Sequence, residues 1–336
     1  MHLSRRACLA AAAALPLAAR AHAYAPQAPA VQRFDPELDR ILATDAKVEV
    51  IASGYRWTEG PVWVRDGGYL LFSDVPANIV HRWQPGRGAA PFLQPSGLVG
   101  PIPAAIREAG ANGLAIDAQG RLVMADSGTR AIARVDLKTK RKTILADRYA
   151  GKRFNSCNDV VIARSGAIYF TDPPYGLAEG DTSPLKEMKA NGVYRLATDG
   201  RVTQLDGSLT RPNGIGLSPD ERTLYVAQSD EQRPVLLAYP LDAQGRASPP
   251  RVLVDFRQDV VAGLPGLPDG MEVAASGHLF ASGPGGIHVL APDGRRLGLI
   301  STGKAAANCN FGEDGRTLFI TSSDSVVRVR LKLSGW

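Results

Sequence analysis

The chain has 336 residues, of which 44% are hydrophobic and 21% charged, with 39 Lys and Arg against 33 Asp and Glu. This composition excludes a disordered chain, a collagen-like repeat and a miniprotein held together by disulfides. The 35 glycines and 24 prolines slightly exceed average usage and indicate many short elements joined by turns.

The first 23 residues have the pattern of an export signal. Arg5-Arg6 is a twin-arginine start, residues 9–19 are an apolar stretch, and residues 21–23 form an A-x-A cleavage site. The apolar stretch is about half as long as a bilayer requires. We therefore expect a cleaved signal peptide rather than an uncleaved anchor, and a periplasmic or secreted protein that begins near Ala23.

Removal of this segment leaves 36 basic and 33 acidic residues, so the net charge falls from +6 to +3. A net charge this small does not indicate any class of binding partner. No Lys/Arg cluster predicts nucleic-acid binding, and no later apolar run is long enough for a membrane span. The sequence leaves the oligomeric state open.

Two cysteines follow the signal, Cys157 and Cys309. An oxidising compartment would permit a disulfide, but two cysteines do not form a framework and the sequence does not give their separation. We favour two buried free thiols.

Residues 24–49 form an N-terminal segment in which residues 36–43 have helical spacing. From 50 to 333 one pattern recurs, in which an apolar strand, an Asp/Gly-rich turn and a second apolar strand predict a β-hairpin. Its copies begin near residues 59, 112, 158, 213, 269 and 307. Further strand pairs lie between the copies, so each unit holds about four strands.

Six four-stranded units with periods of roughly 40–55 residues predict an all-β fold, a single six-bladed β-propeller over residues 50–333. A β-sandwich with coincidental hairpins is the alternative, and six alignable copies argue against it. Residues 103–109 have helical spacing, and we expect them to form a lip over one face together with the loops 174–191 and 256–268.

The innermost strand of each propeller blade runs along the central channel, so residues at one register converge on the axis. The first register position holds Glu59, Asn112, Asn158, Asn213, Asp269 and Ala307. Two carboxylates in a narrow channel repel each other and are costly to desolvate. A divalent cation removes both penalties. Carboxylate and amide oxygens suit Ca²⁺ better than Mg²⁺, Mn²⁺ or Zn²⁺.

The competing interpretation is that these positions only form turns. Asn-Gly and Asp-Gly are common turn dipeptides, and each alone would be read as structural. Their joint occurrence at one register, with Glu59 where no turn preference favours Glu, indicates a metal site.

Four motifs in order resemble the senescence-marker-protein/gluconolactonase/luciferin-regenerating-enzyme family of calcium-dependent six-bladed propellers, and most closely its bacterial gluconolactonases. They are Glu59-Gly-Pro-Val-Trp63, Arg153-Phe-Asn-Ser-Cys-Asn-Asp159, Arg211-Pro-Asn-Gly214 with Ser218-Pro-Asp-Glu221, and Pro268-Asp-Gly-Met271. The set is specific, whereas any one motif alone is weak.

By this resemblance Glu59, Asn213 and Asp269 hold the metal, and Asn158 is a metal or substrate ligand. The implied reaction is hydrolysis of a sugar lactone such as glucono-1,5-lactone. The cation would polarise the carbonyl, and Asp269 would orient or deprotonate the attacking water.

Two other residues are predicted to bind substrate. Arg153 precedes the Asn-Asp pair and is expected to meet sugar hydroxyls, with a solvated loop residue as the alternative. Asn112 joins the channel floor without being a direct metal ligand. Where gluconolactonase-like members often carry a His, this chain has Ser127, which would alter one wall of the site.

Two other functions stay open. The same site would also suit another ester class, such as aryl lactones or phosphotriesters. A binding propeller with a structural ion is the third interpretation, although an acidic channel floor would then be unnecessary.

Overall fold

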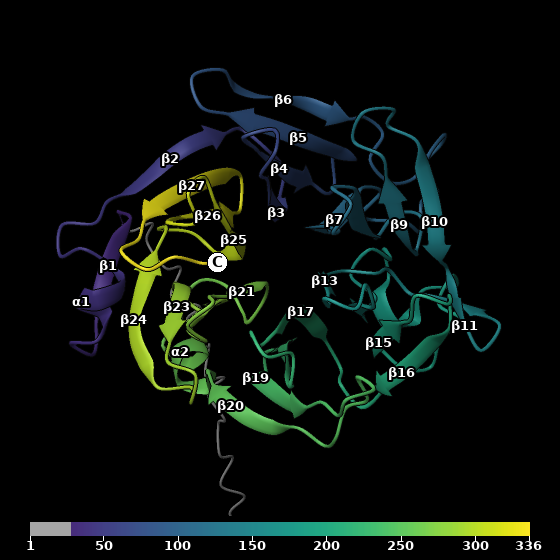
Figure 1. Ribbon diagram of the computed structural model, residues 1–336. Coiled ribbons are helices and arrows are strands. Elements are labelled where there is room, and N and C mark those ends of the chain that lie inside the picture. The colour runs from purple at the N-terminus through teal and green to yellow at the C-terminus, as the bar shows by residue number, and fades with distance from the viewer. Residues whose placement is uncertain (1–27) are drawn as a thin grey trace, which may run out of the picture.

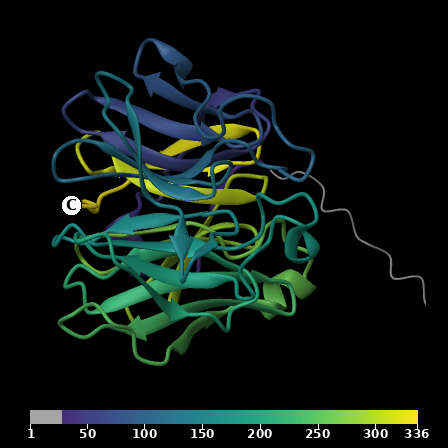
Figure 2. The ribbon, with the colours of Figure 1, turned by 90° about the vertical axis from the view of Figure 1, so that its right-hand side faces the viewer.

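The structure is a computed structural model that describes residues 28–336, so the expected signal peptide lies outside the described residues. Six antiparallel sheets surround a central channel (Figure 1), which confirms the predicted six-bladed β-propeller. Figure 2 views the ring edge-on, with the C-terminus at its left-hand face.

Blades 1 to 3 follow one another along the chain. Blade 1 is β3 (Thr58–Val64), β4 (Tyr69–Asp74), β5 (Ile79–Gln84) and β6 (Gly88–Leu93). Blade 2 is β7 (Ala111–Ile116), β8 (Leu122–Asp126), β9 (Ala131–Val135) and β10 (Lys142–Ala146). The hairpin β11 (Arg148–Tyr149) and β12 (Lys152–Arg153) precedes blade 3, which is β13 (Val160–Ile162), β14 (Ile168–Asp172), β15 (Gly192–Leu196) and β16 (Val202–Asp206).

Blades 4 to 6 complete the ring. Blade 4 is β17 (Pro212–Leu217), β18 (Thr223–Asp230), β19 (Arg233–Pro240) and β20 (Arg251–Asp255). Blade 5 is β21 (Met271–Val273), β22 (Leu279–Gly283), β23 (Gly286–Leu290) and β24 (Arg296–Ser301), with β1 (Ala30–Arg33) as a fifth strand. Blade 6 is β25 (Ala306–Gly312), β26 (Thr317–Ser322), β27 (Ser325–Arg330) and β2 (Val48–Ser53).

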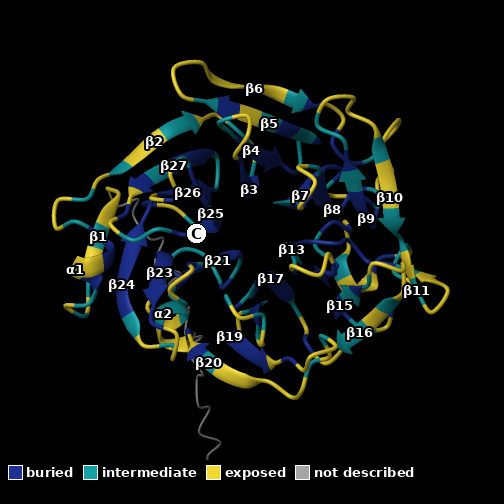
Figure 3. Cartoon of the chain, viewed as in Figure 1, coloured by how far each residue is buried: buried dark blue, intermediate teal, exposed yellow. Residues whose placement is uncertain are grey.

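The hydrophobic core lies between the blades. The middle strands are buried on both faces, whereas the outer strands β6, β10 and β20 are largely exposed (Figure 3). Between blades 1 and 2, for example, Val62 and Leu71 pack with Leu114 and Met124. Antiparallel strands covered on both faces carry apolar residues on both sides, which explains the near-continuous apolar runs of the inner hairpins.

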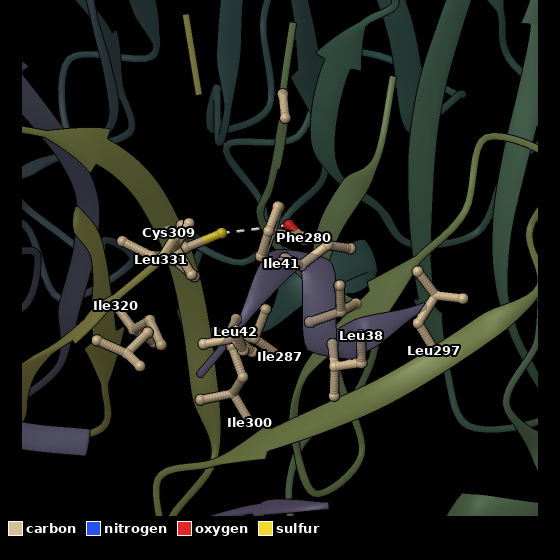
Figure 4. Packing of buried hydrophobic residues seen from close by; sticks show 14 of the residues in the cluster. Leu38, Ile41, Leu42, Phe280, Ile287, Leu297, Ile300, Cys309, Ile320 and Leu331 are labelled. Atoms are coloured by element: carbon tan, nitrogen blue, oxygen red, sulfur yellow. Dashed lines mark hydrogen bonds between the residues drawn. The ribbon is translucent and has the colours of Figure 1, made fainter. Parts of the chain in front are cut away.

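The N-terminal segment closes the ring. β2 pairs antiparallel with β27, so the last blade takes its outer strand from the start of the described chain. The helix α1 (Leu38–Ile41) lies within the predicted helical stretch, and its Leu38 joins Ile41 and Leu42 in the core of blades 5 and 6 (Figure 4).

Both cysteines are buried free thiols, as the sequence favoured. In the core drawn in Figure 4, Cys309 Sγ donates a hydrogen bond of 3.2 Å to the carbonyl oxygen of Phe280. A buried thiol of this kind behaves as a small apolar residue.

The lip differs from the prediction in its secondary structure. Residues 103–109 are not helical, since prolines restrict the start of the segment and its later amide groups bond instead to the neighbouring loop. Ile106 forms an isolated β-bridge with Leu177. The other two loops contain the 3₁₀ helix η1 (Gly180–Thr182) and the helix α2 (Arg257–Val261). No helix within residues 28–336 is long and apolar enough to cross a membrane.

Candidate active site

A cavity of about 630 Å³ lies on the lip side of the channel. Five residues of the predicted register line it together: Glu59, Asn112, Asn158, Asn213 and Asp269. Each lies within two residues of the beginning of an inner strand, where successive blades direct side chains toward the axis. The sixth position, Ala307, is absent from this lining; its carbonyl oxygen instead accepts hydrogen bonds from Gly270 N and Ser282 Oγ.

The residue that follows each polar side chain forms the floor of the cavity. A Cβ atom on Gly60, which has φ +45°, would lie 2.1 Å from Asn112 O, and one on Gly214 would lie 2.1 Å from Asp269 O. Neighbouring inner strands approach so closely that only glycine fits. The Asn-Gly and Asp-Gly pairs therefore serve close strand contact in the channel rather than hairpin turns.

Beneath the floor lies a second, larger cavity of about 1100 Å³, which opens toward the C-terminal Trp336. It shares no lining residue with the upper cavity. Asp159 lies at this lower level, where its carboxylate accepts hydrogen bonds from Val160 N at 2.9 Å and Ile215 N at 3.1 Å. Asp159 thus stands where blades 1, 2, 4 and 5 have a glycine, and it joins blades 3 and 4 through its side chain.

Two acidic residues of the upper cavity interact electrostatically. Glu59 is 3% exposed and accepts hydrogen bonds from Trp57 Nε1 at 3.4 Å and from Gly60 N at 3.2 Å. Burial, and then the charge of Asp159, raise the pKa of Glu59 above its ordinary value. Burial and the charge of Glu59 raise the pKa of Asp269 strongly. Two anions held this close in a buried site require a cation to be stable in their charged forms.

Asn213 has an amide oxygen without a partner. Its Nδ2 donates to Ser229 Oγ at 2.9 Å, and that hydroxyl donates in turn to Pro268 O. Because the single hydroxyl proton of Ser229 is used on Pro268, Ser229 can only accept from Asn213, which fixes the orientation of the amide. Asn213 Oδ1 is buried and makes no hydrogen bond, and an orphaned buried oxygen is costly.

Asn112 and Asn158 are held through their backbones. Asn158 O accepts a hydrogen bond of 2.8 Å from the backbone amide of Gly113, and Asn112 O accepts one of 2.8 Å from Ser73 Oγ. Within residues 28–336 neither side-chain amide forms a hydrogen bond with protein. Both amides are therefore available to a ligand in the cavity.

These donors fit a hard cation. No group of three or more His, Cys, Asp or Glu side chains in the described part of the chain is arranged to hold a metal ion. A cation here would therefore need amide oxygens besides the two carboxylates. The unpartnered Asn213 oxygen beside Glu59 and Asp269 meets this need, and an all-oxygen set of this kind matches Ca²⁺.

Arg153 lies outside the cavity, contrary to its predicted role in substrate binding. It belongs to the β11–β12 hairpin, where its guanidinium group donates to Thr129 O at 2.6 Å and lies 3.9 Å from Asp147. The intervening residues 154–157 run into the core of blade 3, so sequence proximity to Asn158 does not bring Arg153 to the site.

Sequence reasoning missed the residues that the lip contributes. Arg107, Glu108, Tyr175, Val260, Leu264 and Leu267 all line the cavity. They lie outside the repeated hairpins, and only the expectation of a lip over one face pointed to these segments. Ser127, noted as a departure in the sequence, lies 3.5 Å from Glu108 Oε2 through its hydroxyl.

A family model described as the SMP-30/gluconolactonase/LRE-like region matches residues 57–324. The chain belongs to this family. A gluconolactonase of Zymomonas mobilis is 49% identical over 351 aligned residues, which cover 99% of each chain. A solved gluconolactonase from Xanthomonas campestris has a TM-score of 0.77 and 33% identity, over 91% of this chain and 96% of that one.

A calcium-binding regucalcin from Agrobacterium tumefaciens shares the fold, with a TM-score of 0.68 and 20% identity over 87% of this chain. Membership of the family, together with the gluconolactonases that match over almost the whole chain, supports lactone hydrolysis as the chemistry of this protein.

Proposed function

We propose that this protein hydrolyses sugar lactones of the glucono-1,5-lactone type in the upper cavity, with a divalent cation, Ca²⁺, as its cofactor. The observation that carries the proposal is the buried Glu59–Asp269 pair beside the unpartnered oxygen of Asn213. The similarity to gluconolactonases over almost the whole chain supports the substrate class.

Glu59, Asn213 and Asp269 would hold the cation, with Asn158 as a further ligand to the metal or to substrate. When bound, the cation supplies a Lewis acid for the lactone carbonyl and balances the carboxylate charges. Ser229 fixes the amide of Asn213, and Trp57 and Gly60 restrain the carboxylate of Glu59. Preorganised groups of this kind need no rearrangement as the reaction proceeds.

Asp269 is the proposed catalytic residue. Its carboxylate orients a water molecule toward the carbonyl carbon and accepts the proton as the new C–O bond forms. The ring C–O bond then breaks, and the ring oxygen takes up the proton that Asp269 accepted, which gives the open-chain hydroxy acid and restores the carboxylate of Asp269. Asn112 and Asn158, whose amides face the cavity, position the lactone.

The proposal includes the location of the mature protein. The twin-arginine pair and the A-x-A site predict cleavage near Ala23 and export to the periplasm or beyond. N-terminal sequencing of the exported protein tests this.

A pH-stat assay with glucono-1,5-lactone tests the function. We expect acid release that EDTA abolishes and Ca²⁺ restores. Asp269→Asn should lower kcat by about 100-fold or more, whereas the matched change Asp199→Asn, in an exposed turn, should leave it unchanged. Asn213→Ala should weaken Ca²⁺ binding in calorimetry.

The outcomes distinguish the alternatives. Activity confined to aryl lactones or phosphotriesters would show that the substrates of this site belong to another ester class. Calcium binding without hydrolysis of any ester would favour a binding propeller with a structural ion. Full activity in Asp269→Asn would remove that residue from the mechanism.

A further inference from the structure

Glu108 is a third carboxylate in the upper cavity, and the metal chemistry does not use it. It lines the same cavity as Glu59 and Asp269, and its charge raises the pKa of both. It nevertheless does not combine with them into a three-carboxylate cluster. Glu108 therefore faces the cavity from the wall rather than from the metal position.

Most hydrogen-bonding capacity of the Glu108 carboxylate is unused by protein. A carboxylate has about four acceptor positions, and the Ser127 hydroxyl, 3.5 Å from Oε2, occupies one of them. No cation within residues 28–336 forms an ion pair with Glu108. The neighbouring Arg107 directs its guanidinium group to Tyr175 O instead.

The backbone holds Glu108 rigidly. The amide nitrogens of Arg107 and Glu108 both donate to Gly176 O, at 2.8 and 3.3 Å. Ile106 and Ala109 are buried against Leu177 on either side of them. The carboxylate is thus presented from a fixed segment and not from a loose loop.

The wall across the channel is apolar. The loop 94–110 joins blades 1 and 2, and the loop 256–268 joins blades 4 and 5, so the two junctions lie opposite each other in a six-bladed ring (Figure 1). From the second loop Val260, Leu264 and Leu267 line the cavity. The loop 94–110 therefore offers a carboxylate to the cavity, whereas the three side chains of the loop 256–268 offer apolar contact.

A polyhydroxylated ring matches this asymmetry. Its hydroxyl groups can donate to a carboxylate, and charge-assisted hydrogen bonds of this kind are among the stronger ones. Its C–H face can pack on aliphatic side chains. A ring without hydroxyls would leave the carboxylate of Glu108 desolvated and unpaired, which disfavours its binding.

We propose that Glu108 determines specificity by accepting hydrogen bonds from the hydroxyl groups of the lactone, with Ser127 as the residue that positions it. This inference rests on the proposed lactonase function. In this role Glu108 favours hydroxylated lactones over unsubstituted and alkyl-substituted rings of the same size.

The test compares kcat/KM for glucono-1,5-lactone with kcat/KM for δ-valerolactone, which has the same ring without hydroxyls. Glu108→Gln should lower the ratio of the two values about tenfold. Glu179→Gln makes the same charge change at an exposed position of the neighbouring lip loop, and it should leave the ratio unchanged. Thermal melting checks that each variant is folded.

Two further measurements complete the test. Ser127→Ala should lower the ratio less than Glu108→Gln does. In the variant that carries both substitutions, Ser127→Ala should have no additional effect. If Glu108→Gln fails to fold, Ser127→Ala replaces it as the test. Calorimetric titration should give the same Ca²⁺ affinity for Glu108→Gln as for the unaltered protein.

An unchanged ratio in Glu108→Gln, with the unaltered protein active, overturns this inference alone. A tenfold loss of Ca²⁺ affinity in that variant also overturns it, because Glu108 would then be a metal ligand. An unaltered protein that hydrolyses neither lactone overturns the proposed function and this inference together.

Discussion

At the scale of single residues, most polar groups in the interior of this propeller have a hydrogen-bond partner, and a few do not. Ser229 satisfies the amide nitrogen of Asn213, and Asp159 binds two amide groups of adjacent blades. His288 is a partial exception outside the site. Its Nε2 donates to Pro284 O at 3.0 Å, while its buried Nδ1 has no hydrogen-bond partner.

His288 should make stability depend on pH. Burial, together with the charge of Arg296, lowers its pKa to about 4, against about 6.5 in the unfolded chain. Between these values the unfolded state binds the proton and the folded state does not, so stability is lost as the pH falls from 6.5 toward 4. The full loss is about 3 kcal/mol.

Urea unfolding at pH 7 and pH 4.5 measures this effect. His288→Gln cannot take up the proton, so its free energy of unfolding should fall less between the two pH values than that of the unaltered protein. An equal fall in both proteins would contradict the assignment.

At the scale of elements, the inner strands and the segments of the lip could be predicted, but the conformation of the lip and its site residues could not. Alternation, turn residues and the repeated register located the hairpins, and Glu59, Asn158, Asn213 and Asp269 converge because all inner strands begin at one level. Glu108 lies in a loop whose position depends on long-range bonds to Gly176, which no local pattern encodes. The helical spacing of residues 103–109 was misleading for the same reason.

Gly214 tests the role of the channel floor. In Gly214→Ala the new methyl group would lie 2.1 Å from Asp269 O, so blades 4 and 5 must separate. We expect a loss of about 1–3 kcal/mol of stability and a fall in activity on the order of 100-fold, because Asp269 moves.

Gly216→Ala is the matched control on the same strand. Its methyl group would meet side chains and no backbone atom, those of Met271 at 3.2 Å and Val273 at 3.4 Å. Activity assays and thermal melting compare the two variants. Equal effects of both changes would mean that strand propensity, and not the close approach of the backbones, explains the glycine at 214.

At the scale of the whole molecule, the ring depends on a strand that enters from the N-terminal segment. β2 supplies the outer edge of blade 6, β1 adds to blade 5, and α1 buries Leu38 and Ile41 in the core that these blades share. The ends of the described chain are thereby joined non-covalently. A propeller opened here would expose β27 as an unpaired edge, which favours aggregation.

Truncation tests the closure. A chain that begins at Gly54 lacks β1, α1 and β2, and we expect it to lose cooperative thermal unfolding and to aggregate during size-exclusion chromatography. A chain that begins at Ala30 keeps all three elements and should melt as the longer protein does. A cooperative transition at the same temperature in both would show that the ring closes without β2.

The floor that separates the two cavities also limits the routes by which substrate and product could enter and leave the site. Glycine backbones and Asp159 lie below the register residues and separate the two cavities, so under the proposed function the open-chain acid would leave by the same opening through which the lactone enters. Under the proposed function that acid would be an anion, and Glu108 and Glu231 line the same cavity. Repulsion between like charges would then favour release of the acid over release of the neutral lactone.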